Sequence, residues 1–232
     1  MAKAQSEGSR AIAGTRDVRA KRYRSPAFHK ELTALLGIGL SGSLAALLQT
    51  DLLPAGPDIP DDLAVSHEAT FVLAAAASSL THPASLTEAA RGVLALDYQL
   101  EFGPKASDDR KGRRKGRPSL NKDYLGTHLA TAFWKLARLR HNAVVHTRSF
   151  ELTIGWNAFG KSVALVHYPE RETTLVYTHG FLFPNLHPGI ARMDHLEFEL
   201  PVKLFLPAET IFRFGKLMQG GGDYCGEKPS DG

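Results

Sequence analysis

Apolar residues recur at steps of three and four along the first two thirds of the chain, which is the spacing of one face of an α-helix. Ser25 and Pro26 suit a helix start, because serine can cap the free amide groups of the first turn and proline fits its first position. The apolar face runs from Phe28 to Leu40 and, past three glycines, to Leu48. The first predicted helix therefore begins near residue 26.

Three more helices are predicted. One begins at Asp61-Asp62, whose carboxylates complement the helix dipole, and runs to about Leu80. The next begins at the capping box Ser85-Leu86-Thr87-Glu88 and continues through Leu100 to a break at Gly103-Pro104. The fourth is an amphipathic stretch from Tyr124 to Val145 with a single apolar stripe.

The pattern changes after Thr147. Segments 150–154 and 196–200 alternate apolar and polar side chains, which is the period of a half-buried strand. Segments 163–168 and 173–177 are rich in β-branched and aromatic residues, and a further strand is predicted over 202–206. Residues 208–218 are predicted to form a last helix. We therefore predict an α+β fold, with an N-terminal four-helix bundle followed by an antiparallel β-meander and a short C-terminal helix.

These patterns divide the chain into four parts. Residues 1–24 lack apolar periodicity and are expected to be a disordered basic tail. The helical bundle is predicted over residues 25–149 and contains a basic loop at 105–122. A β-rich region is predicted over 150–218, followed by a flexible tail over 219–232.

Composition limits the class of protein. The chain has 232 residues and is 43% hydrophobic, which suits a buried core. It contains no apolar run near the ~20 residues that span a bilayer, and its first residues lack the apolar centre of a secretory signal. The single cysteine, Cys225, excludes an internal disulfide and a cysteine-built zinc site. A cytoplasmic protein with no metal, cofactor or membrane contact is expected.

The net charge of +4 is unevenly distributed. Residues 1–24 carry seven Lys/Arg and two acids, and residues 105–122 carry eight and two, so these segments hold +5 and +6 and the rest of the chain holds −7. Such segments are typical of arms that contact polyanions, although a solubilising tail and a solvated loop are the alternative. Phosphate contacts without base reading are predicted for Lys111, Arg113, Arg114, Lys115 and Arg117.

The clearest chemistry closes the fourth predicted helix, in the sequence Arg140-His141-Asn142-Ala143-Val144-Val145-His146. Arginine binds phosphate oxygens through a planar fork, and histidine exchanges protons near neutral pH. Metal-free RNA cleavage needs one group that moves a proton and another that stabilises charge on the phosphate. His146 and Arg140 fit these two roles, and His141 and Asn142 could support them. The alternative is structural, because cations also suit a helix C-terminus.

Helix geometry separates the two main residues. At ~100° and ~1.5 Å per residue, Arg140 and His146 lie about 120° apart around a helix and roughly 9 Å apart along it. They could act along one edge of the helix, or two copies of the chain could share a composite site across a two-fold axis. The second arrangement makes a homodimer part of the mechanism.

This stretch resembles the signature of the HEPN (higher eukaryotes and prokaryotes nucleotide-binding) superfamily, in which an arginine, a polar residue and then a histidine close a bundle helix. Arg140, His141 and His146 match it, with five residues between arginine and histidine where four is commonest. Alternatively, Asn142 and His146 match the Asn-x-x-x-His half, which places His141 where the arginine belongs. The resemblance implies a helical domain over about half of the chain, metal-independent endoribonuclease activity and a dimer with facing motifs.

Two further patterns are weaker. Four histidines in the β-rich region have no cysteine or His-x-His pair near them, so surface or hydrogen-bonded histidines are predicted there rather than a metal site: His167, His179, His187 and His195. Aromatic residues of the same region could stack nucleic-acid bases, but most are expected in the core. They are Phe150, Trp156, Phe159, Tyr168, Tyr177, Phe181 and Phe183.

We therefore expect a metal-independent endoribonuclease that acts on RNA in a bacterial toxin or phage-defence-like system, with a cognate antitoxin or regulator as a possible protein partner. The first alternative is a non-catalytic nucleic-acid-binding accessory protein that uses the same basic segments. The second is a protein-interaction regulator, such as an antitoxin or plasmid factor.

Overall fold

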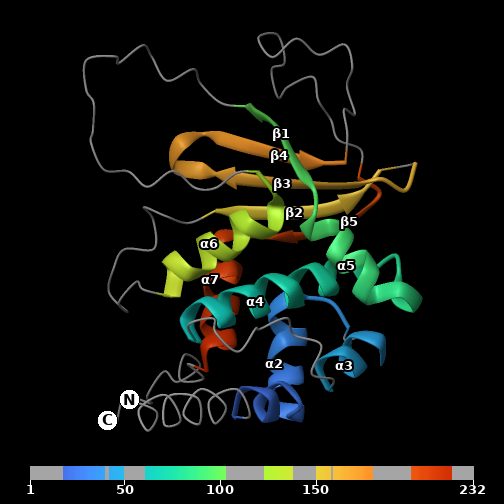
Figure 1. Cartoon of the computed structure of the whole chain (residues 1–232), viewed down its shortest axis with the longest axis vertical. Coiled ribbons are helices and arrows are strands. Elements are labelled where there is room, and N and C mark those ends of the chain that lie inside the picture. The colour runs from blue at the N-terminus through green and yellow to red at the C-terminus, as the bar shows by residue number, and fades with distance from the viewer. Residues whose placement is uncertain are drawn as a thin grey trace, which may run out of the picture.

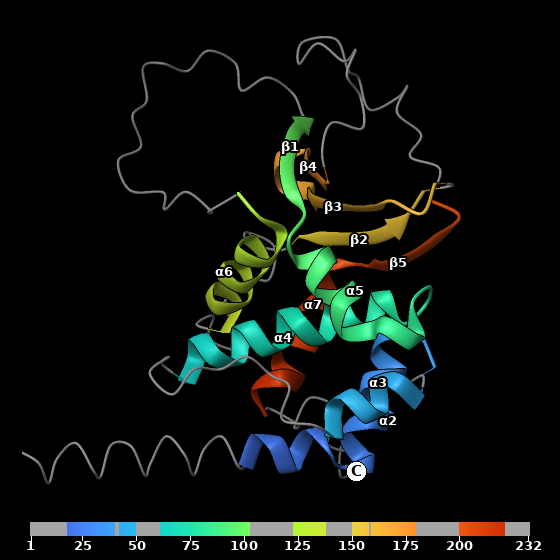
Figure 2. The same ribbon diagram turned by 45° about the vertical axis from the view of Figure 1, so that its right-hand side comes forward.

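The computed structural model describes residues 18–39, 42–49, 61–102, 123–137, 150–157, 159–179 and 200–220. Within these ranges, helices cover one face of a five-stranded antiparallel sheet, so the fold is α+β as predicted (Figures 1 and 2). None of the helices in these ranges is long and apolar enough to cross a membrane.

Along the described parts of the chain, four helices with defined bounds precede the first strand, one lies between the first and second strands, and one follows the last strand. The helices are α2 (Pro26–Leu36), α3 (Gly42–Gln49), α4 (Asp61–Ser78), α5 (Leu86–Leu94), α6 (Leu125–Ala137) and α7 (Ala208–Gln219), with 3-10 turns at Pro83–Ser85 and Pro169–Arg171. The strands are β1 (Asp97–Phe102), β2 (Glu151–Trp156), β3 (Ser162–Tyr168), β4 (Thr173–Thr178) and β5 (Val202–Leu206).

The strands lie in the order β1-β4-β3-β2-β5, with every neighbouring pair antiparallel. Strands β2, β3 and β4 form the predicted meander, and β5 pairs with β2 in a register that places Leu206 opposite Leu152. Alternate residues of each strand turn toward the helices. These inward residues supply the sheet side of the core: Leu152, Ile154, Ala164, Val166, Leu175, Tyr177, Leu204 and Leu206.

The start of α2 agrees with the sequence signals. The Ser25 hydroxyl oxygen accepts a hydrogen bond from the amide of Phe28 at 3.2 Å, and Pro26 occupies the first turn. The helix ends where Gly37 adopts a left-handed conformation, with φ of 65°. This conformation favours glycine, so the long apolar face predicted from Phe28 to Leu48 is divided between α2 and the separate helix α3.

Helix α4 lies at the centre of the helical layer and contacts α5, α6 and α7. It begins at Asp61 as predicted and ends two residues before Leu80. Its second half is buried on all sides, including an alanine run from Ala74 to Ala77. Alanine allows neighbouring helices to approach closely, so this helix can occupy the middle of the layer.

The third predicted helix was wrong beyond Leu94. Helix α5 ends there, and Asp97–Phe102 form β1, which pairs with β4. The predicted capping box also fails, because Ser85 closes a 3-10 turn and its side chain makes no cap hydrogen bond. Since β1 lies in the same sheet and core as the later strands, the predicted boundary at residue 150 does not separate a helical part from a β part.

The prediction of a disordered tail over residues 1–24 was wrong for its last residues. Residues 18–23 are helical, and the Tyr23 side chain is only 1% exposed. The Tyr23 hydroxyl donates a hydrogen bond to Glu68 of α4 at 2.7 Å, and Arg19 forms an ion pair with the same buried carboxylate at 3.3 Å. These contacts attach the end of the basic segment to the core. Residues 1–17 and the predicted tail from 221 onward lie outside the described residues.

Candidate functional site

The structure fixes the elements that flank the catalytic candidates. Arg140, His141, Asn142 and His146 all lie between α6 and Phe150, outside the described residues. The predicted phosphate-binding residues lie between β1 and Asp123, also outside them: Lys111, Arg113, Arg114, Lys115 and Arg117. The structure describes the flanking frame, namely β1 and α6 on either side of the basic loop, and α6 and β2 on either side of the catalytic candidates.

Helix α6 is held by an aromatic cluster near its C-terminal end. The Phe133 ring meets Phe214 of α7 edge-on at 5.7 Å between centroids. It also meets Phe150, the residue just before β2, at 6.4 Å. Aromatic pairs in this geometry add about 0.5–1.5 kcal/mol to their burial. Phe133 precedes segment 138–149 and Phe150 follows it, so the two ends of this segment are attached to one buried cluster.

A second contact joins α6 to the sheet through His128. The Tyr168 hydroxyl of β3 lies 2.6 Å from Nε2 of His128, and the Tyr177 hydroxyl of β4 lies 2.7 Å from Nδ1. All three side chains are buried. Burial is the main cause that raises the pKa of both tyrosines above the usual tyrosine range. Both phenols therefore stay protonated and able to form these bonds.

The histidine and its two tyrosines form a positioning contact rather than a reaction centre. A neutral imidazole has one N–H donor and one acceptor nitrogen, so it can accept from one phenol and donate to the other. Because His128 is fully buried, no substrate reaches it. Sequence reasoning missed this role. The available signal was the position of His128 beside Leu125 and Leu129 on the apolar stripe of the helix.

The aromatic residues of the strands divide into core and surface. Four of the seven that the sequence singled out are buried, as expected for most of them: Phe150, Trp156, Tyr168 and Tyr177. Phe159, in the turn between β2 and β3, is 87% exposed. Phe181 and Phe183 lie outside the described residues. A further exposed ring, Phe205 of β5, was not predicted.

The two described histidines of the predicted β-rich region, His167 and His179, have hydrogen-bond partners. Nδ1 of His167 lies 3.0 Å from the Thr174 hydroxyl, and Nε2 of His179 lies 3.1 Å from the carbonyl oxygen of Gly92. His187 and His195 lie outside the described residues. Among the residues that the structure does describe, no group of three or more His, Cys, Asp or Glu side chains could hold a metal ion.

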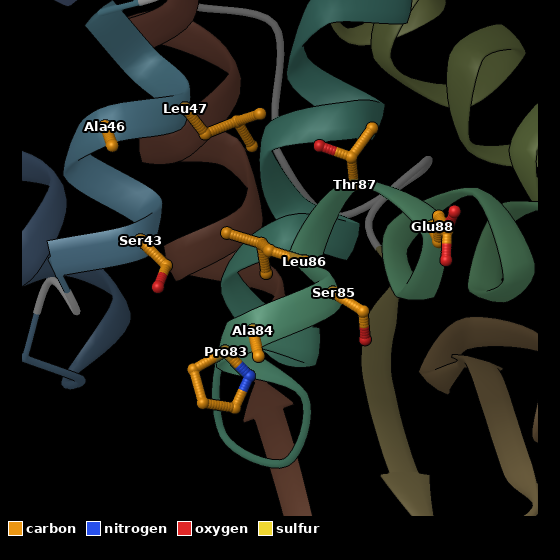
Figure 3. Close-up of a pocket in the computed structure, with 9 residues that line it drawn as sticks. All are labelled: Ser43, Ala46, Leu47, Pro83, Ala84, Ser85, Leu86, Thr87 and Glu88. Carbon is orange, nitrogen blue, oxygen red and sulfur yellow. The ribbon is translucent and has the colours of Figure 1, made fainter.

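An open pocket of about 530 Å³ lies between α3 and the start of α5. Figure 3 shows Ser43, Ala46 and Leu47 of α3 on one side of it and residues 83–88 on the other. Its lining contains one carboxylate, Glu88, and neither histidine nor any Lys or Arg. This pocket therefore lacks the groups that would bind or cleave a phosphodiester.

Comparisons of the chain with protein-family models, with curated proteins and with solved structures give no match. The resemblance to the HEPN signature therefore depends on residues 140–146 alone.

Proposed function

We propose that this protein is a HEPN-like, metal-independent endoribonuclease of a bacterial conflict or mobile-element system. The observation that carries the proposal is the sequence Arg140-His141-Asn142-Ala143-Val144-Val145-His146, which follows α6. In this proposal α2, α4, α5 and α6 provide a HEPN-like bundle, and two copies of the chain form the active dimer. The single cysteine suits a cytoplasmic location, where thiols stay reduced.

The proposed reaction needs only proton transfer and charge stabilisation. His146 takes the proton from a ribose 2′-OH, and the resulting oxygen attacks the neighbouring phosphorus. The bond from phosphorus to the 5′-oxygen breaks, and that oxygen takes up a proton. The products are a 2′,3′-cyclic phosphate and a 5′-hydroxyl. Arg140 stabilises the negative charge on the phosphate, while His141 and Asn142 supply a second proton carrier and an orienting amide.

The flanking frame supports this proposal. Reactive groups must be held on well-packed elements to act with useful precision. Phe133 and Phe150 hold the two ends of segment 138–149 in one buried cluster, and His128 anchors α6 to the sheet. The residues that carry the chemistry are thus attached at both ends to the core of the protein.

In this proposal the basic loop at 105–122 gathers RNA. It is followed by Asp123, whose carbonyl oxygen accepts a hydrogen bond from the Tyr98 amide at 3.0 Å, next to the start of α6. The 13 residues of α6 then span about 20 Å at 1.5 Å per residue. In this proposal the loop contacts phosphates of the same RNA strand that is cleaved beyond the other end of the helix.

The test is cleavage of total RNA by the purified full chain in EDTA. We expect cleavage that His146→Ala slows by about 10²–10⁴-fold and that Arg140→Ala strongly reduces. His67→Ala is the matched control, because His67 is exposed on α4 and has no role in the proposal. An absence of cleavage by the wild-type protein, or full cleavage by the His146→Ala variant, would remove the proposal.

The main rival is a nucleic-acid-binding protein without catalysis. It predicts salt-sensitive RNA binding that Arg113→Ala and Arg114→Ala weaken, with no cleavage and no effect of substitutions at Arg140 or His146. A protein-interaction regulator predicts instead one stoichiometric protein partner in a pull-down and no bound RNA.

A further inference from the structure

Strand β5 presents alternate side chains to opposite sides of the sheet. Leu204 and Leu206 are buried against the helices. Lys203 and Phe205 therefore project from the outer face, away from the helices, and both are exposed. Phe205 is 52% exposed, whereas each of the two leucines on the opposite face is at most 4% exposed.

The pairing of β5 with β2 leaves these two side chains beside small residues. Lys203 lies opposite Gly155, and a Cβ added to that glycine would lie 3.0 Å from the Lys203 Cβ. Phe205 lies opposite Thr153. The Leu200 side chain also packs on this face, since its Cδ1 would lie 3.0 Å from a Cβ on Gly155, and Lys203 and Phe205 remain exposed beside it.

The turn between β2 and β3 is tightly bonded and presents a second ring. The Asn157 side-chain oxygen accepts hydrogen bonds from the amides of Phe159 at 3.0 Å and Lys161 at 2.9 Å. The Asn157 amide also donates to the Lys161 carbonyl oxygen at 3.0 Å, and Gly160 takes the left-handed conformation. Phe159 is therefore held in solvent by a defined turn, with Lys161 two residues away.

The strand register gives the spacing of these four residues along the β2–β5 pair. Lys203 and Phe205 are two residues apart, or about 7 Å along the strand. Asn157, at the turn, is four residues from the Thr153 position opposite Phe205, or about 13 Å. Along the strand axis, Phe159 and Lys161 belong to the turn, Lys203 follows, and Phe205 is farthest from the turn. We call this set, Phe159, Lys161, Lys203 and Phe205, the aromatic-lysine surface.

We propose that the aromatic-lysine surface binds single-stranded nucleic acid, with the two rings stacking on unpaired bases and the two lysines contacting phosphates. Flat bases joined by anionic phosphates match rings that are separated by ammonium groups. A protein partner fits less well, because lysine is depleted from the centres of protein interfaces. This inference rests on the proposed function, since it names single-stranded RNA as the substrate class.

Binding is measured by fluorescence anisotropy with a labelled, unstructured single-stranded RNA in EDTA. All proteins carry His146→Ala, so cleavage does not contribute to the signal. We expect Phe159→Ala and Phe205→Ala to weaken binding by about tenfold each. The matched control is Tyr124→Ala, because Tyr124 is 51% exposed against 52% for Phe205 and lies next to β1, at the opposite edge of the sheet.

The lysines have a separate readout. Lys161→Ala together with Lys203→Ala should reduce the slope of log affinity against log salt by about 1.4, at ~0.7 for each phosphate contact to a single strand. Lys30→Ala, an exposed cation on α2, should leave the slope unchanged. A duplex RNA of the same length should lose little affinity on loss of the two rings, since its bases are already stacked.

Unchanged affinity of the double phenylalanine variant, or equal losses for single-stranded and duplex RNA, overturns the proposal. The proposal is also overturned if a partner protein binds one-to-one through these rings and the ring substitutions leave the affinity for RNA unchanged. The aromatic variants Phe159→Tyr and Phe205→Tyr should retain binding, which separates loss of stacking from loss of structure. Since binding is measured without cleavage, a wild-type protein that binds in this way but does not cleave removes the proposed reaction and leaves this surface in place.

Discussion

The hydroxyl of Tyr177 on β4 lies 2.7 Å from Nδ1 of His128 on α6, and this contact joins the helix that precedes the candidate catalytic residues to an inner strand of the sheet. The two residues are 49 positions apart in the chain, so only the folded protein brings them together. Their rings also meet edge-on, at 5.7 Å between centroids. The position of α6 thus depends on a polar contact inside an apolar core.

Removing this contact should destabilise the protein. Tyr177→Phe leaves a buried imidazole nitrogen without its phenol, which costs about 1–3 kcal/mol in the free energy of unfolding. The measurement is urea denaturation followed by circular dichroism. Tyr124→Phe is the control, because its side chain is exposed, and it should change stability by less than ~0.5 kcal/mol. Equal stabilities of the two variants would show that the contact contributes nothing.

Stability should fall steeply in alkaline solution. Burial raises the pKa of Tyr23, Tyr168 and Tyr177, and the nearby Glu68 carboxylate adds to the effect at Tyr23. In the unfolded chain these phenols lose their protons near pH ~10, while the folded protein keeps them. The stabilising contribution is therefore fully present below that pH and is lost above it, at up to ~1.4 kcal/mol per pH unit for each tyrosine.

The free energy of unfolding measured between pH 8 and pH 11.5 checks this expectation. Tyr23→Phe should make the decline above pH ~10 shallower by about one tyrosine's share. A stability that is constant over this range, or a decline that Tyr23→Phe leaves unchanged, would contradict the burial of these phenols.

Two glycines should respond in opposite directions to alanine. At Gly155 an added Cβ would lie 2.9 Å from the carbonyl oxygen of Val202, so β5 has to move, at a cost of about 1–3 kcal/mol. At Gly92 in α5 a Cβ meets nothing within 4 Å, and alanine should stabilise the helix by about 0.5–1 kcal/mol. Thermal unfolding of both variants gives the comparison. A stabilising Gly155→Ala would contradict the close approach of β5 to β2.

Elements with strong local signals were predictable from the sequence. The cap at Ser25 is one example, and the predicted strand over 202–206 is another, since β5 begins at Val202 and ends at Leu206. Helix α4 followed from its acidic start and long apolar run. In each case the residues that decide the structure lie within the element itself.

Elements that depend on distant partners were not predictable. Leu100 was assigned to a helix because it continues the spacing of α5, yet it lies in β1 opposite Val176 of β4. The helical residues before Tyr23 depend in the same way on Glu68, 45 positions away. Exposure of Phe205 depends on which face of β5 meets the helices. The residues Arg140, His141, Asn142 and His146 lie outside the described residues, so their roles stay predictions.

The central claim is that His146 cleaves RNA without a metal ion. The most direct measurement is the single-turnover cleavage rate of an end-labelled single-stranded RNA in EDTA, with product ends identified. We predict fragments with a 2′,3′-cyclic phosphate and a 5′-hydroxyl, a rate lowered about 10²–10⁴-fold by His146→Ala, and an unchanged rate with His67→Ala. Cleavage by the His146→Ala variant at the wild-type rate, or a wild-type protein that leaves the RNA intact, would contradict the claim.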